Sequence, residues 1–425
     1  MNKNTFNTYL SILNKDLIVA MGCTEPIAIA YACAKARQTL GKMPEHCTVF
    51  CSGNVVKNAM GVTVPNSGGL KGIVVAAILG IVGGDPSRGL EVLETVSKQD
   101  IVQTESLLEK DFCQCELLEN VAGLHILAVV SAGNDTAEVM IEDFHTNIVR
   151  ITKNGENQFF KQCNPSQIRE NDPDKSLLTI KDILTFANQV KMEDVEELLS
   201  RQIRYNSAIS MEGLSHPYGV QVGRTLMNDF DSSNVKLRAK AAAAAGSDAR
   251  MSGCSLPVVI NSGSGNQGIT VSLPVLEYAK EYNVGREQLY RALVVSNLVA
   301  IHQKKYIGNL SAYCGAVSAA CGSGAGIAYL LGCSYEEICS TITNTIATIG
   351  GMVCDGAKPS CAAKIASAVD AAIMALHLSR NNLFFQPGDG LVDKDVEKTI
   401  INIGRMGREG MKSTDLEILN IMLDR

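Results

Sequence analysis

A stretch of thirty residues without a charged side chain, residues 306–335, constrains the fold more than any other feature of this chain. It is long enough to cross a membrane, but it contains six glycines and several serines. Lipid favours leucine and isoleucine at such positions. We therefore predict buried helices whose small side chains let neighbouring backbones approach closely. A second apolar stretch, residues 72–83, has only about half of the ~20 residues that a span needs, so we expect no membrane partner.

The composition of the whole chain excludes several classes of protein. Of 425 residues, 46 % are hydrophobic, which excludes a disordered chain and supplies a sizeable core. The length suggests about two or three domains. The formal net charge of −6 provides no basic face, so we expect no nucleic-acid partner.

The cysteines indicate a reducing compartment. The fourteen cysteines are spread over a long chain, which is not typical of a disulfide scaffold. The first residues lack an apolar signal core, and Asp16 interrupts the first apolar run. We therefore expect free thiols and a cytoplasmic location.

The pattern of apolar and turn residues predicts an α+β fold in three parts. Residues 1–85 read as helix, strand, loop and helix, with a helix entered at Pro26 and a strand over residues 47–51. Residues 86–165 read as a small α/β unit, with strands over residues 124–130, 137–141 and 147–152. Residues 175–425 read as a mainly helical domain, with helices from residue 192, over residues 236–245 and 286–305, and from the Ser334–Glu337 capping box to Gly350.

Two cysteines, Cys354 and Cys361, lie in and directly after a loop that leads into a predicted helix. Cys354 lies in a glycine-rich loop, and Cys361 begins a predicted helix that continues to about residue 378. A helix N-terminus favours a thiolate and suits an anionic inorganic cluster. The spacing of the two matches neither a common ferredoxin pattern nor a zinc knuckle. From spacing alone, small buried packing residues remain the alternative.

A third cysteine also precedes a helix. Cys23 lies just before the helix that Pro26 enters, where unpaired N–H groups and the helix dipole are expected to lower the pKa of its thiol. A buried packing role is the alternative. Glu25 follows in the first helical turn, where a carboxylate that stabilises the helix end is as good an interpretation as a catalytic one.

A glycine-rich loop over residues 263–268 fits the pattern G-x-G-x-x-G. A dinucleotide-binding unit needs a helix next, but residues 269–274, which end in proline, should break that helix. We therefore reject a nicotinamide cofactor. Successive N–H groups with the side chains of Ser264 and Asn266 are better suited to a small carboxylate.

A second loop offers similar chemistry. Ser67 and Gly68 open a predicted helix, and Asn58 and Lys57 precede them in the sequence. We name Asn58, Ser67 and Gly68 as further candidates for substrate binding, with ordinary turn chemistry as the alternative for both loops. Lys358 is the candidate for pairing with a substrate carboxylate or with a cluster, and a solvated lysine is its alternative.

The segment over residues 351–361, with its Cys-Asp-Gly-Ala-Lys-Pro-Ser-Cys run, is similar to the cluster-binding segment of iron–sulfur L-serine dehydratase alpha chains. Gly-Cys-Thr-Glu-Pro at residues 22–26, together with residues 261–268, resembles more closely the L-cysteine desulfidase family. The resemblance covers nearly the whole chain, and the combination of the two motifs is specific.

This resemblance implies a 4Fe–4S cluster held by Cys314, Cys354 and Cys361. Three protein thiolates leave one iron open, and such an iron is a Lewis acid. Cys321 follows Cys314 by about two helical turns and remains an alternative ligand. The resemblance makes Cys23 the catalytic residue, either as the base that takes the α-proton or as a thiol that assists.

The activity that the resemblance implies is the conversion of L-cysteine and water to pyruvate, hydrogen sulfide and ammonia. We prefer L-cysteine because no cysteine follows Cys361, whereas a cysteine in the tail of the iron–sulfur serine dehydratases caps the open iron. The first alternative is L-serine dehydration on the same scaffold. The second is an iron–sulfur sensor without turnover, although the sequence offers no basic recognition helix. We expect a small amino-acid substrate and a homo-oligomer.

Overall fold

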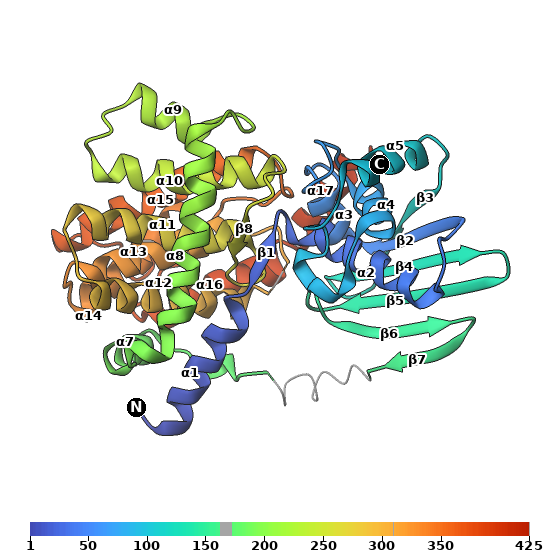
Figure 1. The fold of residues 1–425 in the computed structure, drawn as a ribbon. Helices are drawn as coiled ribbons and strands as arrows, with labels where there is room; N and C mark the ends of the chain where they lie inside the picture. Colours follow the sequence, from blue (N-terminus) through green and yellow to red (C-terminus); the bar gives the residue numbers. More distant parts are fainter. Residues whose placement is uncertain (162–171, 309, 425) are drawn as a thin grey trace.

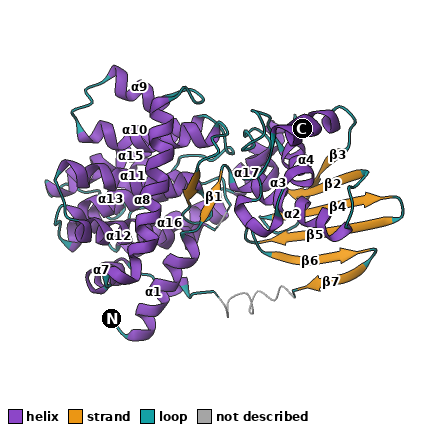
Figure 2. Cartoon of the chain, viewed as in Figure 1, coloured by secondary structure: helices purple, strands orange, loops and turns teal. Residues whose placement is uncertain are grey.

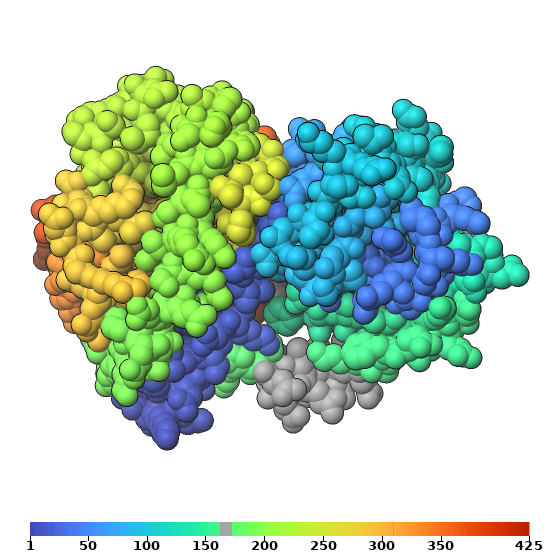
Figure 3. All heavy atoms as spheres, in the orientation of Figure 1, coloured from blue at the N-terminus to red at the C-terminus, as the bar shows by residue number. Residues whose placement is uncertain are grey.

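The computed structural model describes residues 1–161, 172–308 and 310–424. The described chain forms a helical lobe and a lobe built around a sheet, which meet along one seam (Figure 1, Figure 3). A two-stranded antiparallel ribbon, β1 (Val19–Met21) with β8 (Pro257–Val259), lies between them. The mainly helical α+β fold that the sequence predicts is confirmed (Figure 2).

A mixed six-stranded sheet forms the second lobe. Its order is β3-β2-β4-β5-β6-β7, in which β2 and β3 are parallel and the other neighbours are antiparallel. The strands are β2 (His46–Ser52), β3 (Cys113–Leu118), β4 (His125–Ala132), β5 (Asp135–Glu142), β6 (Ile148–Lys153) and β7 (Glu156–Phe160). Buried and more exposed residues alternate along β4 and β5, because helices cover one face of the sheet.

The covering helices come from both ends of the described chain. They are α2 (Thr24–Leu40), α3 (Gly53–Ala59), α4 (Ile73–Gly83), α5 (Lys98–Leu108) and α17 (Lys412–Met422). Helix α2 packs on the sheet and against α4, and the two backbones approach so closely that a Cβ at Gly80 would lie 2.3 Å from the carbonyl oxygen of Ala30. Helix α17 packs on α3, so a late segment of the chain completes the sheet lobe.

The helical lobe has a buried centre of small residues. Its helices are α1 (Lys3–Asp16), α7 (Ile180–Gln189), α8 (Met192–Ser215), α9 (Val222–Asp229), α10 (Val235–Met251), α11 (Gly265–Glu281), α12 (Arg286–Ile307), α13 (Gly315–Leu330), α14 (Tyr335–Ile349), α15 (Ser360–Arg380) and α16 (Val396–Arg405). Helix α13 is almost entirely buried. A Cβ at Gly322 would lie 2.5 Å from the carbonyl oxygen of Ser296 in α12. The close packing predicted for residues 306–335 is therefore observed in α13.

Within the described residues, one helix has the length and apolar composition of a membrane span, namely α15. It packs against α10, α13 and α14, and 56 % of its most apolar window is buried inside the protein. The buried core helix of a soluble protein passes the same test of length and composition.

Two predictions about the fold are wrong. The expected boundary near residue 85 does not separate two packing units, because β2 pairs with β3 and β4 in one sheet. The expected break over residues 269–274 is absent, because α11 continues through Pro274. Proline removes one backbone hydrogen bond, and the packing of α11 against α10 and α13 outweighs that loss. The strands β3 and β7 were not predicted, and residues 162–165 of the predicted α/β unit lie outside the described residues.

Candidate active site

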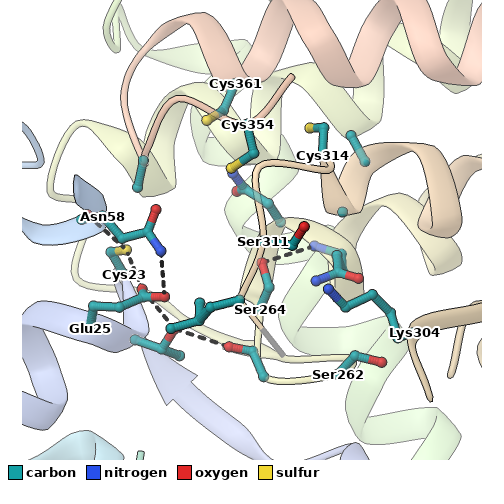
Figure 4. Close-up of a pocket in the computed structure, with 18 of the residues that line it drawn as sticks. Cys23, Glu25, Asn58, Ser262, Ser264, Lys304, Ser311, Cys314, Cys354 and Cys361 are labelled. Carbon is teal, nitrogen blue, oxygen red and sulfur yellow. Dashed lines mark hydrogen bonds between the residues drawn. The ribbon is translucent and has the colours of Figure 1, made fainter. Parts of the chain in front are cut away.

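A cavity of about 150 Å³ lies where the two lobes meet. It is lined by the first residues of α2, α11, α13 and α15, by the last residues of α10 and α12, and by the turn between β5 and β6. Both lobes therefore contribute side chains. Figure 4 shows Cys314, Cys354 and Cys361 on one side of the cavity and Cys23, Glu25 and Asn58 on another.

Backbone pairing brings two of the three cysteines side by side. The N–H of Cys314 donates to the carbonyl oxygen of Met352 at 3.0 Å, and the N–H of Cys354 donates to that of Ala312 at 2.6 Å. Cys314 is the residue before α13, and Cys361 lies in the first turn of α15. The loop between the second and third cysteines thus returns both thiols to the same cavity. The thiolate that the helix start was expected to favour at Cys361 is not observed, because burial raises the pKa of this thiol.

Cations surround this thiol-rich end. Lys57 is 2 % exposed, contacts the carbonyl oxygen of Cys354 with its Nζ at 3.4 Å and pairs with Asp415. A hydrogen bond from Cys314 and the charge of Lys57 lower the pKa of Cys354, against the effect of burial. Burial lowers the pKa of Lys304 to about 8, and the neighbouring thiols of Cys314 and Cys354 oppose that shift. An anionic sulfur is therefore favoured at Cys354, whereas the hydrogen bond to Cys354 and burial raise the pKa of Cys314, and burial raises that of Cys361.

A glycine lets the cysteine loop approach α3. Gly356 has φ of +94°, which favours glycine, and a Cβ there would lie 2.2 Å from the carbonyl oxygen of Lys57. Any larger residue would push the loop that carries Cys354 away from the sheet lobe.

The donor set bears on which metal centre the cavity could hold. No group of three or more His, Cys, Asp or Glu side chains among the described residues is arranged to hold a single metal ion. Three thiols line the cavity, with buried Lys57 and Lys304 near them. Thiolates are the usual ligands of iron–sulfur clusters, so the chemistry of this donor set fits an anionic cluster.

A hydrogen-bonded group of side chains forms another end of the cavity. The Sγ of Cys23 donates to Oε2 of Glu25 at 3.1 Å, and the hydroxyl of Thr24 donates to the same oxygen at 3.2 Å. The side-chain amide of Asn58 donates to Oε1 of Glu25 at 3.3 Å. Nε2 of His145, from the turn between β5 and β6, lies 3.7 Å from that oxygen. Glu25 is therefore the centre of a polar group rather than a cap of α2.

The protonation of this group differs from what the sequence predicts. Burial and the nearby Glu25 carboxylate raise the pKa of Cys23 well above its ordinary value. Burial also acts to raise the pKa of Glu25, but His145 and the Cys23 thiol outweigh it and hold that pKa at about 2. The expected lowering at Cys23 is thus wrong for the resting protein, because burial and then the nearby carboxylate raise the pKa of its thiol.

The two ends of the cavity lie close together. Cys23 packs with Val62 and Met251 in a small buried cluster, and Cys361 and Ala357 pack against the same cluster. A small ligand can therefore touch the acid–base group and the thiol-rich end at once.

Several polar atoms around the cavity are buried without a hydrogen-bond partner among the described residues. They are Nε of Arg250, Oδ1 of Asn266, Oε1 of Gln267 and Oη of Tyr313. Oδ2 of Asp16 and Nε2 of His145 also lack a hydrogen bond, but they lie within ion-pair distance of Lys175 and Glu25. Most buried polar atoms in proteins are paired. A concentration of unpaired donors and acceptors on one cavity indicates a place for a polar ligand.

Seven of the ten predicted site residues line this cavity: Cys23, Asn58, Ser264, Asn266, Cys314, Cys354 and Cys361. The structure does not bring the other three, Ser67, Gly68 and Lys358, into the described lining. The hydroxyl of Ser67 donates to Leu70 within its own turn, and Lys358 pairs with Asp355. For these three, turn chemistry and a local ion pair describe what the structure shows.

Cys321 is placed away from the lining of the cavity in the described structure. It is fully buried in α13, with its Sγ 3.7 Å from the carbonyl oxygen of Ile342 in α14. Although Cys321 follows Cys314 by only about two helical turns, its side chain lies in the contact between α13 and α14.

Sequence reasoning missed six acidic or basic residues of the cavity: Asp16, Asp143, His145, Lys175, Arg250 and Lys304. Arg250 had a usable signal, because it is a charge at the end of a long run of small apolar residues, where a buried helix is expected. His145 lies in a turn far from Glu25 in the sequence, and no local pattern identifies it.

The comparisons with known proteins agree with this architecture. The sequence model of the serine dehydratase alpha chain family matches residues 87–420. A UPF0597 protein of Lachnoclostridium phytofermentans is 52 % identical over 422 residues, covering 99 % of this chain and 100 % of the relative. UPF0597 proteins of Desulfitobacterium hafniense and Treponema denticola are 50 % and 44 % identical, over 420 and 427 residues. They cover 99 % and 100 % of this chain and 97 % and 99 % of the relatives.

The family match includes the segments of all three candidate cluster cysteines, and the relatives extend it to the segment of Cys23. The scaffold is that of a serine-dehydratase-like lyase, a family associated in general with iron–sulfur centres. This chain belongs to the serine dehydratase alpha chain family, among relatives named UPF0597.

Proposed function

We propose that the protein is an iron–sulfur-dependent lyase that degrades L-cysteine to pyruvate, hydrogen sulfide and ammonia. The observation that carries the proposal is the convergence, on one cavity, of three thiols with the Cys23–Glu25 pair. A β-elimination needs both ends, one to hold the leaving group and one to take a proton from the α-carbon.

Cys314, Cys354 and Cys361 are the residues that would hold a 4Fe–4S cluster. Three thiols share the cavity, and buried Lys57 and Lys304 lie beside them to balance negative charge. When bound, the cluster supplies a Lewis-acidic iron for the β-substituent of the substrate.

Cys23 is the proposed base for the α-proton. Its thiol is protonated at rest, so it has to lose its proton first, and Oε2 of Glu25 is the acceptor in contact with it. The other oxygen of Glu25 faces His145 at 3.7 Å, so we propose that His145 helps to position this carboxylate. The Cys23 thiolate then takes the α-proton, and Asn58 keeps the Glu25 carboxylate in place.

The remaining chemistry needs little help from the protein. Loss of the α-proton and the β-substituent leaves an enamine, which tautomerises to an imine and hydrolyses to pyruvate and ammonia. We propose L-cysteine rather than L-serine because a soft thiolate is a better ligand for iron than a hydroxyl oxygen.

The test is an assay of anaerobically reconstituted protein with L-cysteine and L-serine side by side. We expect pyruvate from both or from L-cysteine alone, with the larger kcat/KM for L-cysteine. A value for L-serine equal to or above that for L-cysteine would establish the serine dehydratase alternative. A full cluster without pyruvate from either amino acid would favour the sensor alternative and overturn the lyase proposal.

The proposal also includes a cellular location and an oligomeric state. We propose a cytoplasmic location, which the free thiols of the described residues support. We also propose a homo-oligomer, supported by the neighbouring apolar side chains of Leu383, Phe384 and Phe385, which are 39–56 % exposed. The molecular mass in solution tests the oligomer.

A further inference from the structure

A buried arginine of the cavity has no ion-pair partner among the described residues. Arg250 lies in the last turn of α10 and is 2 % exposed. Across the described residues it forms no ion pair with a carboxylate, and its Nε is buried without a hydrogen-bond partner. A guanidinium stays charged at any physiological pH, and burying it unpaired is strongly unfavourable.

The position of the guanidinium is fixed by two neighbours. The first turn of α11 lies against it, since a Cβ at Gly265 would be 2.2 Å from Nε of Arg250. Arg250 lines the same cavity as Cys23 and Cys361, and its charge opposes the rise in the pKa of both thiols. Arg250 is thus near both the proposed base and one proposed cluster ligand.

The acidic side chains around the cavity form no ion pair with Arg250. Asp16 pairs with Lys175, and Asp143 is itself engaged. Oδ2 of Asp248, on the same helix as Arg250, accepts a hydrogen bond from the N–H of Gly223 at 2.9 Å, and its Oδ1 has no hydrogen-bond partner among the described residues. Glu25 accepts from Cys23, Thr24 and Asn58. The anion that neutralises Arg250 therefore has to come from outside the described chain.

Two unpaired acceptors accompany this unpaired cation. Oδ1 of Asn266 and Oε1 of Gln267 line the same cavity, are buried, and have no hydrogen-bond partner in the described structure. Both residues belong to the first turn of α11, next to Gly265. A cation and two acceptors form a site for a ligand with one carboxylate and one ammonium group.

We propose that Arg250 binds the α-carboxylate of a small α-amino acid, with Asn266 and Gln267 accepting from its ammonium group. The identity of the amino acid rests on the proposed function, whereas the site for the carboxylate stands on the unpaired guanidinium alone. With the carboxylate on Arg250, the α-carbon lies beside Cys23 and the β-substituent can turn toward Cys314, Cys354 and Cys361. Arg250 is therefore a determinant of substrate orientation.

The test measures binding without turnover. L-Alanine has both charged groups but no β-substituent to eliminate, ethylamine lacks the carboxylate, and propionate lacks the amine. Calorimetry with each compound, on protein with and without reconstituted iron and sulfide, should show the strongest binding for L-alanine. R250M should weaken L-alanine binding on the order of 10²-fold, and R250K should be intermediate because lysine lacks the planar fork.

Stability separates a ligand site from a structural role. Removing an unpaired buried charge should leave the unfolding temperature of R250M unchanged or raise it, whereas a structural arginine would lower it. G265A, which crowds the guanidinium without removing it, is the second variant if R250M fails to fold. R238M, on the same helix but outside the cavity, where Arg238 pairs with Glu277 and Glu281, is the matched control and should bind L-alanine as the wild type does.

The outcomes are distinct from those of the lyase assay. Arginine-dependent binding of L-alanine supports this inference even if no amino acid yields pyruvate. Absence of L-alanine binding by the wild type, or equal affinity of the wild type, R250M and G265A, overturns it. Pyruvate formation by R250M with an unchanged KM for L-cysteine also overturns it.

Discussion

The sheet lobe and the cavity both contain buried cysteines, but the charged and polar groups around the two sets differ. Cys47 on β2 is in register with Cys113 on β3, and apolar side chains and other thiols surround them. A hydrogen bond to Cys47, followed by burial, raises the pKa of Cys113. In the cavity a hydrogen bond from Cys314 lowers the pKa of Cys354, and the charges of Lys57 and Lys364 add to that shift. Both settings therefore contain hydrogen-bonded thiols, and the cavity adds cations beside them.

The largest effect is expected at Cys354. C354A should abolish cluster binding, because it removes a thiolate from the centre of the cation-lined end. Iron and sulfide counts after anaerobic reconstitution, with the broad absorption near ~400 nm that such clusters give, measure the loss. C321A is the control and should keep the cluster, since Cys321 faces α14. A normal cluster in C354A would show that Cys354 is not a cluster ligand and would leave it a packing cysteine like those of the sheet lobe.

The next effect concerns Cys23. C23A should keep the cluster but lower kcat by on the order of 10²–10⁴-fold, as loss of a general base commonly does. Its absorption spectrum should match that of the wild type while pyruvate formation falls. Turnover near the wild-type rate would make Cys23 a packing residue like those of the sheet lobe.

A smaller effect is expected for stability at acid pH. The folded-state pKa of Glu25, about 2, lies below its ordinary value of 4.5. The stabilisation that this provides, on the order of 3 kcal/mol, is present above pH 4.5 and is lost as the pH falls toward 2. Urea unfolding at pH 6 and pH 3.5 should therefore show a smaller loss of unfolding free energy for E25Q than for the wild type. Equal losses would show that Glu25 is not a buried carboxylate held ionised by its neighbours.

The smallest effect belongs to the sheet lobe. C47A should lower the free energy of unfolding by about 1 kcal/mol, a typical value for a small core truncation, and leave cluster content and kcat/KM unchanged. Denaturant unfolding and the pyruvate assay on one preparation measure both. A tenfold change in kcat/KM would mean that these thiols serve the active site after all.

Local patterns predicted most elements and most of the cavity, because both depend on short stretches of sequence. The strand at residues 47–51, the helix that Cys361 begins and the cysteine loop were predicted from turns and helix starts. The path of α11 through Pro274 and the pairing of β2 with β3 depend on packing between distant segments, which no local pattern contains. His145 reaches Glu25 for the same reason. Arg250 was missed because a charge in a helix is usually assigned to solvent.

The ion pair between Lys57 and Asp415 has a consequence for how the protein is made. Asp415 follows Lys57 by 358 residues, so a ribosome working at 5–20 residues per second needs about 20–70 s to produce the second partner after the first. Until Asp415 has been made, α17 cannot pack on α3. During that time Lys57 lies beside the cysteine loop, or beside the space that this loop will occupy, without its carboxylate partner Asp415. Loading of iron and sulfur is therefore expected to follow translation rather than accompany it, and a pause late in synthesis would expose an incomplete thiol site to oxidants.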